Sequence, residues 1–289
     1  MTNIPDKFIL SISRPDFTLL NIFYKYLAIV KFFPFLNHKK KRRFRMKRVL
    51  ITGAMSGIGL AATKLFLERN WYVFMADKNE DPEIYNILNQ YYPDKVYFLK
   101  CDVSKDKDVK HLHSKIFETC NGIDSIINNA GIIKHGLLHE TSEKDWDELM
   151  ANDVKSIYLT SKYFLPDLIE NKYGTIVNTA SISGISADYQ MPVYNAAKGA
   201  VVNLTRAMAL DYAKYNIRVN SVCPGATDTK MLNPDNIPKY AAANPLKRIC
   251  EPVEVAKAIY FLSTDESSYC NGVNLPVTGG LDVHSGQPK

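Results

Sequence analysis

One buried strand runs through a glycine-rich turn directly into a helix, and this feature constrains the fold of the chain most. Residues 48–52 (RVLIT) form an apolar, β-branched run typical of a strand covered on both faces, and residues 60–69 have helical spacing. Between them, residues 53–59 read GAMSGIG. Glycines there permit a tight turn and let a pyrophosphate approach the backbone at a helix N-terminus. The segment therefore predicts the phosphate-binding turn of a βαβ unit.

Further apolar runs alternate with helical patterns along the rest of the chain. They occupy residues 71–77, 96–102, 124–131, 175–180, 216–222 and 273–280. Parallel strands need crossover connections, which are usually helices, so this alternation is typical of an α/β fold. We therefore expect a Rossmann-type doubly wound sheet of about seven parallel strands in a single domain.

The net charge of +6 is distributed unevenly. Of the 36 Lys and Arg residues, eleven lie in residues 1–47 beside only two acids, whereas residues 48–289 hold 25 basic and 28 acidic residues. The body of the chain is therefore mildly acidic, and no nucleic acid partner is expected.

The basic segment at the N-terminus can be interpreted in several ways. Residues 17–37 are apolar and aromatic, and a polybasic run follows them as far as Lys47. Aromatic side chains and lysines suit a lipid headgroup region, so a membrane surface could be contacted through residues 17–47 only. Translation from Met46 is the alternative, and another kind of appendage is a third. We assign residues 1–46 as a basic, aromatic leader.

The cysteines and histidines give no pattern of a disulfide framework or a metal site. The cysteines are odd in number, scattered and never in a CxxC pair. His111 and His113 lie two apart on an expected helix and point in different directions, and His135 and His139 fall in an expected loop with no acidic or cysteine ligand set around them. We expect free thiols, a reducing and hence cytoplasmic location, and no metal. The cysteines are Cys101, Cys120, Cys223, Cys250 and Cys270, and the histidines considered are His111, His113, His135 and His139.

A tyrosine and a lysine follow the strand at 175–180. Tyr194 and Lys198 are four residues apart in a helical pattern, so they lie on one helical face. A lysine ammonium near a phenol favours the phenolate, and Ser181 stands at the exit of the preceding strand. Two such hydroxyls could donate to one carbonyl oxygen, as acid–base chemistry at a ketone or alcohol requires.

The carboxyl ends of parallel strands meet at one edge of a sheet, where ligands bind. That edge gathers residues 53–59, Asp77, Asp102, residues 128–131, Ser181 and Pro224. Asp77 lies eighteen residues beyond Gly59, where a carboxylate can accept hydrogen bonds from both adenosine ribose hydroxyls and repel a 2′-phosphate. We therefore expect NAD rather than NADP, although Lys78 would attract the phosphate.

With these motifs, the chain from about Lys47 to Gly280 resembles the short-chain dehydrogenase/reductase family. The similar segments are a cofactor loop, a sheet-stabilising motif, a nicotinamide-side loop and a catalytic tetrad. In order they are Thr52-Gly53-x-x-x-Gly57-x-Gly59; Asn128-Asn129-Ala130-Gly131; Pro224-Gly225 with Thr229; and Asn152, Ser181, Tyr194 and Lys198.

The resemblance implies a role for each member of the tetrad. Tyr194 would be the acid in reduction and the base in oxidation, and Ser181 would hold the substrate oxygen. Lys198 would stabilise the phenolate and bind the nicotinamide ribose, and Asn152 would position a water that passes protons to Lys198. The cofactor-binding residues that it implies are Gly53, Ser56, Gly57, Ile58, Gly59, Asp77, Asp102, Val103, Asn129, Ala130, Gly131, Tyr194, Lys198, Pro224, Gly225, Thr227 and Thr229.

A substrate pocket is expected beside these residues. Residues 226–250 are irregular and rich in proline, and a long loop in a compact α/β domain commonly covers a substrate. Ser183, Asp188, Tyr189 and Gln190 are further candidates for its lining.

Residues 47–289 are thus expected to form a dinucleotide-binding oxidoreductase domain, with residues 226–250 as its substrate loop. Its reaction would transfer a hydride between NAD(H) and a secondary alcohol or ketone of low molecular weight. Two alternatives remain, namely an NADPH-dependent 3-oxoacyl carrier-protein reductase and a non-catalytic nucleotide-sensing or scaffolding protein. The resemblance also implies a homotetramer, with the Tyr194 helix and residues 143–170 at one interface.

Overall fold

The computed structural model describes residues 46–283, and these belong to one compact unit. The expected leader, apart from Met46, lies outside the described residues. Within them, no helix is both long and apolar enough to cross a bilayer. All five cysteines are described, and each is a free thiol.

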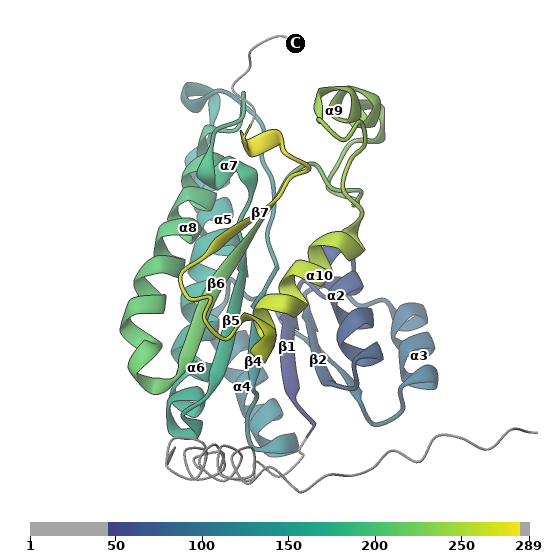
Figure 1. The fold of residues 1–289 in the computed structure, drawn as a ribbon, viewed down its shortest axis with the longest axis vertical. Coiled ribbons are helices and arrows are strands. Elements are labelled where there is room, and N and C mark those ends of the chain that lie inside the picture. The colour runs from purple at the N-terminus through teal and green to yellow at the C-terminus, as the bar shows by residue number, and fades with distance from the viewer. Residues whose placement is uncertain (1–45, 284–289) are drawn as a thin grey trace, which may run out of the picture. The chain divides into compact units, whose positions relative to one another are not determined.

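The described residues form a seven-stranded parallel sheet, which confirms the expected doubly wound α/β fold (Figure 1). The strand order is β3-β2-β1-β4-β5-β6-β7, so the order reverses between β1 and β4. Ligands bind at such a switch point in doubly wound folds. The strands are β1 (Arg48–Thr52), β2 (Tyr72–Asp77), β3 (Val96–Lys100), β4 (Ser125–Asn128), β5 (Gly174–Thr179), β6 (Ile217–Pro224) and β7 (Asn274–Val277).

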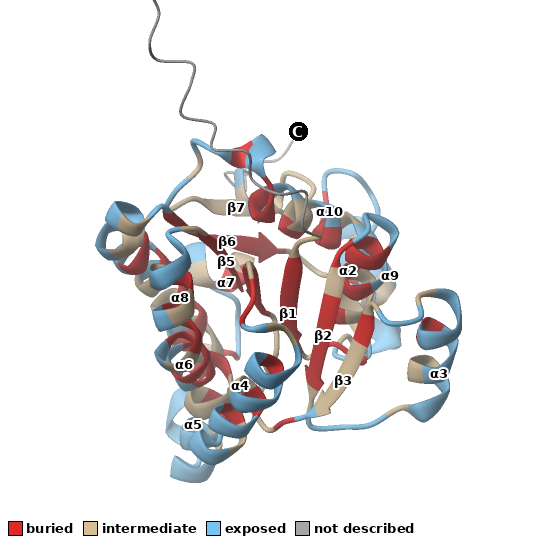
Figure 2. Ribbon diagram, turned by 90° about the horizontal axis from the view of Figure 1, so that it is seen from below, coloured by how far each residue is buried: buried red, intermediate tan, exposed pale blue. Residues whose placement is uncertain are grey.

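Helices cover both faces of the sheet (Figure 2). α2, α3 and α10 pack on one face, and α4, α6 and α8 pack on the other. The helices are α2 (Gly57–Glu68), α3 (Pro82–Tyr91), α4 (Asp106–Cys120), α5 (Glu143–Met150), α6 (Ser156–Asn171), α7 (Ile182–Ile185), α8 (Pro192–Tyr212), α9 (Ile237–Ala243) and α10 (Pro252–Ser263).

The central strand β1 explains why the sheet is buried on both sides. All five of its residues are buried. Leu50 belongs to the core under α4, α6 and α8, whereas Val49 and Ile51 belong to the core under α2 and α10. Successive side chains of a strand point to opposite faces, so an unbroken apolar run supplies both cores at once.

The expected helix over residues 143–170 is interrupted. A π-helical turn, Ala151–Lys155, separates α5 from α6. A π turn inserts an extra residue into a helix and is frequent at functional sites. It therefore changes which residues face the sheet at this point.

The segment 226–250 also differs from the expected irregular loop. It contains a 3-10 turn, Pro234–Asn236, and the helix α9, and a bridge joins Thr227 to Cys250 at its two ends. Pro238 occupies the first turn of α9, where proline is well tolerated. None of the residues of α9 is buried, so the sequence carries no apolar periodicity that would have indicated this helix.

Candidate active site

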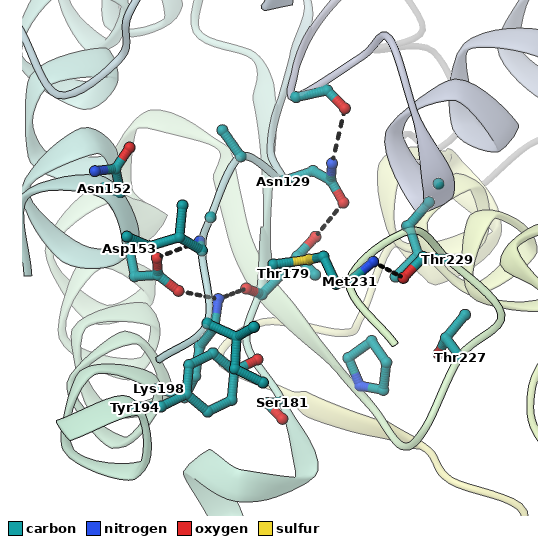
Figure 3. Close-up of a pocket in the computed structure, with 18 of the residues that line it drawn as sticks. Asn129, Asn152, Asp153, Thr179, Ser181, Tyr194, Lys198, Thr227, Thr229 and Met231 are labelled. Atoms are coloured by element: carbon teal, nitrogen blue, oxygen red, sulfur yellow. Dashed lines mark hydrogen bonds and ion pairs between the residues drawn. The ribbon is translucent and has the colours of Figure 1, made fainter. Parts of the chain in front are cut away.

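A cavity of about 360 Å³ lies along the carboxyl edge of the sheet. Its lining comes from the ends of β1 to β6 and from the segment that contains α9. Figure 3 shows that side chains from distant parts of the sequence converge on it. Every expected cofactor-binding residue lines this cavity except Gly59.

The glycine-rich turn forms the start of α2 as expected. Gly53 and Gly57 have φ angles of 63° and 51°, in the left-handed region that glycine adopts without strain. Gly59 lies against the turn, because a Cβ atom there would be 2.0 Å from the carbonyl oxygen of Gly53. The side chain of Ser56 makes no capping hydrogen bond, so the N–H groups of the first helical turn are not capped by it.

The carboxylate of Asp77 lies beside this turn. It accepts hydrogen bonds from the backbone N–H of Met55 at 3.1 Å and of Asn79 at 3.0 Å. The carboxylate of Asp102 instead accepts from the N–H and hydroxyl of Ser104, which closes its own turn. Asp77 is therefore the acid best placed to meet a ribose next to the glycine turn.

Asn129 connects the ends of three strands. Its amide donates to the carbonyl oxygens of Thr52 and Gly53 at 3.1 and 3.3 Å, and it accepts from the hydroxyl of Thr179 at 3.3 Å (Figure 3). The hydroxyl of Thr52 accepts from the N–H groups of Asn129 and Ala130. These bonds fix the ends of β1, β4 and β5, which form the floor of the cavity.

Ser181, Tyr194 and Lys198 lie together at the other end of the cavity (Figure 3). The ammonium of Lys198 is 5.6 Å from the ring centroid of Tyr194 and donates to the carbonyl oxygen of Thr179 at 3.0 Å. Ser181 caps the short helix α7, which packs closely on α8 because a Cβ atom at Gly184 would be 2.5 Å from the carbonyl oxygen of Lys198. The expected juxtaposition of these three residues is therefore present.

The structure also brings Asp153 to this cluster, which the sequence analysis did not single out. Its Oδ2 atom is 2.9 Å from the Nζ atom of Lys198, and Oδ1 accepts a hydrogen bond from the N–H of Ile132 at 2.8 Å. Burial alone would lower the pKa of Lys198, but attraction by Asp153 and Tyr194 outweighs it, and the pKa is raised. Lys198 is therefore a buried cation with a buried carboxylate partner.

Asn152 departs from the expectation. Its amide donates to the carbonyl oxygen of Glu148 at 2.8 Å and lies away from Lys198 in Figure 3, although the residue lines the cavity. Asp153, in the same π turn, faces Lys198 instead. A signal was present in the sequence, since Leu149, Asp153 and Ile157 are spaced by four and all three are buried.

The expected substrate residues divide into two pairs. Ser183 and Asp188 line the cavity, and the hydroxyl of Ser183 lies 3.1 Å from that of Ser181 and donates to Asp188. Tyr189 is 98% exposed, and neither it nor Gln190 lines the cavity. Gln190 has a φ of 58°, in the left-handed region.

Several apolar residues of the cavity were not named from the sequence. They come from the start of α8, the segment before and within α9, and the last described turn, and they are Met191, Met231, Leu232, Tyr240 and Leu281. Three of them lie in the expected substrate loop, but the residue types alone do not indicate which side chains point inward.

Comparisons with known proteins agree with this geometry. A family model described as enoyl-(acyl carrier protein) reductase matches residues 53–282. Meso-2,3-butanediol dehydrogenase of Serratia marcescens is 40% identical over 250 residues, which are 86% of this chain and 99% of that protein. The 3-oxoacyl-[acyl-carrier-protein] reductase FabG of Thermotoga maritima is 34% identical over 246 residues, covering 83% and 100%.

Two solved structures are similar over nearly their whole length. ElxO with NADP bound has a TM-score of 0.79 and 29% identity, covering 83% of this chain and 100% of its own. A 3-ketoacyl-(acyl-carrier-protein) reductase from Brucella melitensis complexed with NADH has a TM-score of 0.77 and 29% identity, covering 82% and 98%.

The contact between Gly59 and Gly53 gives a test of the glycine turn. We expect Gly59→Ala to weaken the binding of a nicotinamide dinucleotide by about tenfold or more, because the new Cβ atom forces the turn away from the helix start, and loss of only about 1.4 kcal/mol has this effect. Calorimetry or fluorescence titration measures it. Gly199→Ala is the control, since a Cβ atom there would lie 3.9 Å from the carbonyl oxygen of Gly184, at ordinary van der Waals distance. Equal affinities of the two variants would contradict the prediction.

Proposed function

The chain belongs to the short-chain dehydrogenase/reductase family, and we propose that it uses NAD(H) to interconvert a small secondary alcohol and the corresponding ketone. The observation that supports this most is the cluster of Ser181, Tyr194 and Lys198 at one end of a cavity whose other end carries the glycine turn and Asp77. A bound dinucleotide would extend over both ends of the cavity. The carbonyl group of a substrate would bind at the end that carries Ser181, Tyr194 and Lys198.

In this proposal, each residue of the cluster has a distinct task. NAD(H), when bound, supplies the chemistry of hydride acceptance or donation. Tyr194 gives a proton to the ketone oxygen in reduction and takes it from the alcohol in oxidation. Ser181 donates a hydrogen bond to the same oxygen, and the ammonium of Lys198 favours the phenolate of Tyr194.

The cofactor would be held by the residues that line the cavity from the glycine turn to α8. The N–H groups around Ser56 and Gly57 would bind the pyrophosphate, Asp77 the adenosine ribose, and Lys198 the nicotinamide ribose. Asp102, Val103, residues 129–131 and the segment that contains Pro224, Gly225, Thr227 and Thr229 would form the remaining walls.

Asp77 supports NAD over NADP. Its carboxylate is held beside Met55 of the glycine turn, where a 2′-phosphate would meet a negative charge. Lys78 and Asn79 also line this end of the cavity, and the similar solved structures include both NADP and NADH complexes. The charge of Asp77 is therefore the feature on which the preference depends.

We expect the protein to turn over faster with NADH than with NADPH, measured as kcat/KM with a panel of ketones and 3-oxoacyl thioesters. Asp77→Asn should shift the NADPH/NADH ratio towards NADPH by about tenfold, because it removes the repelling charge. Glu80→Gln, an exposed acid on the same loop, should leave the ratio unchanged. A preference of the unaltered protein for NADPH with 3-oxoacyl thioesters would support the reductase alternative instead.

The proposed acid–base role of Tyr194 can be separated from binding. Tyr194→Phe should lower kcat by about 10²–10⁴-fold, the usual contribution of a positioned acid or base, with NADH still bound. Tyr189→Phe makes the same change at a residue that is 98% exposed and should have no effect. Undiminished physiological activity of Tyr194→Phe would favour the nucleotide-sensing or scaffolding alternative.

The relatives guide the choice of substrates. Meso-2,3-butanediol dehydrogenase is named for a vicinal diol, and the cavity here combines the apolar residues Met191, Met231 and Leu232 with the carboxylate of Asp188. Such a lining suits a small molecule with an apolar side and one or two hydroxyls. We therefore place secondary alcohols, vicinal diols and α-hydroxyketones first in the panel.

We also propose a cytoplasmic homotetramer. The free thiols support a reducing compartment. The exposed apolar side chains of Trp146 on α5, Tyr158 on α6 and Leu210 on α8 support an interface on these helices. Light scattering after size exclusion should give four times the mass of one chain, and Tyr158→Glu should reduce it. A monomer at micromolar concentration would refute this assembly.

A further inference from the structure

We propose that Asp153 is the permanent counter-ion of Lys198 and that its negative charge sets the pH range in which Tyr194 exchanges protons. Asp153 is then a positioning residue, because it acts on Tyr194 through Lys198. The consequence for turnover rests on the proposed function, whereas the ion pair itself does not.

The two neighbours of the Asp153 side chain require a carboxylate. One oxygen accepts from the N–H of Ile132 at 2.8 Å, and the other lies 2.9 Å from the ammonium of Lys198. Both neighbours are donors, so an amide or a protonated acid would turn an N–H or O–H group towards one of them. Only the ionised carboxylate both accepts from Ile132 and faces the ammonium with a negative charge.

The site is built to hold this charge out of solvent. The side chains of Asp153 and Lys198 are 0% and 5% exposed. A Cβ atom at residue 131 would lie 3.0 Å from the Oδ2 atom of Asp153, so Gly131 leaves the space that the carboxylate occupies. Charges at such depth are poorly screened by water or salt, and their effect on neighbours is strong.

The position of Lys198 does not depend on Asp153 alone. The ammonium also donates to the carbonyl oxygen of Thr179 at 3.0 Å, and this oxygen belongs to the end of β5 (Figure 3). Removal of the carboxylate charge therefore leaves the lysine with one of its two anchors. Because the carbonyl oxygen of Thr179 still holds the lysine, a variant of Asp153 tests the effect of the carboxylate charge on the site.

That charge opposes the effect of Lys198 on the phenol. A cation near Tyr194 favours the phenolate, and an anion 2.9 Å from this cation cancels much of its field. Among the described residues, the charged or titratable groups that act on Lys198 are Asp153, Tyr194 and Cys223, and burial raises the pKa of Cys223. None of these three supplies a second cation, so the balance between Lys198 and Asp153 dominates at this point.

The main test is the pH dependence of kcat/KM in both directions. Because Tyr194 also attracts Lys198, we expect the lysine to keep its charge without Asp153. Asp153→Asn and Asp153→Ala should then each move the acidic midpoint of alcohol oxidation about one unit lower, since phenolate formation becomes easier without the anion. The alkaline midpoint of ketone reduction should move in the same direction. Asp147→Asn, an exposed acid on α5, is the matched control and should leave both midpoints in place.

The pH profiles distinguish the proposal from a purely structural role of Asp153. A purely structural role of Asp153 would scale the rates at every pH without moving a midpoint, and that result would overturn the proposal. Midpoints that move towards higher pH would overturn it as well. Parallel shifts in Asp153→Asn and Asp153→Ala, which differ in hydrogen bonding but not in charge, would support it.

A second experiment needs no turnover. Thermal unfolding is measured for Asp153→Asn, Lys198→Met and the double variant. Each single change leaves a buried group without its charged partner, so the double variant should lose less than the two single losses together. Additive losses would overturn the ion pair. Coupled losses in a protein that turns over no alcohol or ketone would refute the proposed function and leave the ion pair established.

Discussion

The site depends on hydrogen bonds that hold the carboxyl ends of neighbouring strands against one another. Asn129 joins the backbone of Thr52 and Gly53 to the hydroxyl of Thr179, so β1, β4 and β5 end at fixed positions. The carbonyl oxygen of Thr179 in turn accepts from Lys198. One framework therefore shapes the end of the cavity with the glycine turn and also positions the acid–base cluster, which explains how the two ends keep their separation.

The sheet and the glycine turn could be predicted from the sequence, because each is indicated by residues that are adjacent in the chain. Each of the seven strands coincides with an apolar or β-branched run of the sequence, and its observed bounds lie inside or close to that run. The turn needs glycine for steric reasons, as the contact between Gly59 and Gly53 shows. The helix α9 was not predicted because it is short and buries none of its residues.

The identity of the residue beside Lys198 was not predictable from the residue types alone. The resemblance to the family pattern indicates the amide of Asn152 and gives no weight to its neighbour Asp153. The spacing distinguishes them, because Leu149, Asp153 and Ile157 lie four residues apart and all three are buried.

Burial of Lys198 makes its geometry more specific than an exposed lysine would allow. An ammonium has three N–H donors, and the hydrogen bond to the carbonyl oxygen of Thr179 uses one of them. The carboxylate of Asp153 holds the ammonium as an ion pair at 2.9 Å. These two anchors restrict the position of Lys198, so a ribose hydroxyl on the side of the cavity that Lys198 lines would meet a cation whose place is already fixed. The carboxylate that limits the field of Lys198 on Tyr194 thus also fixes how Lys198 can bind.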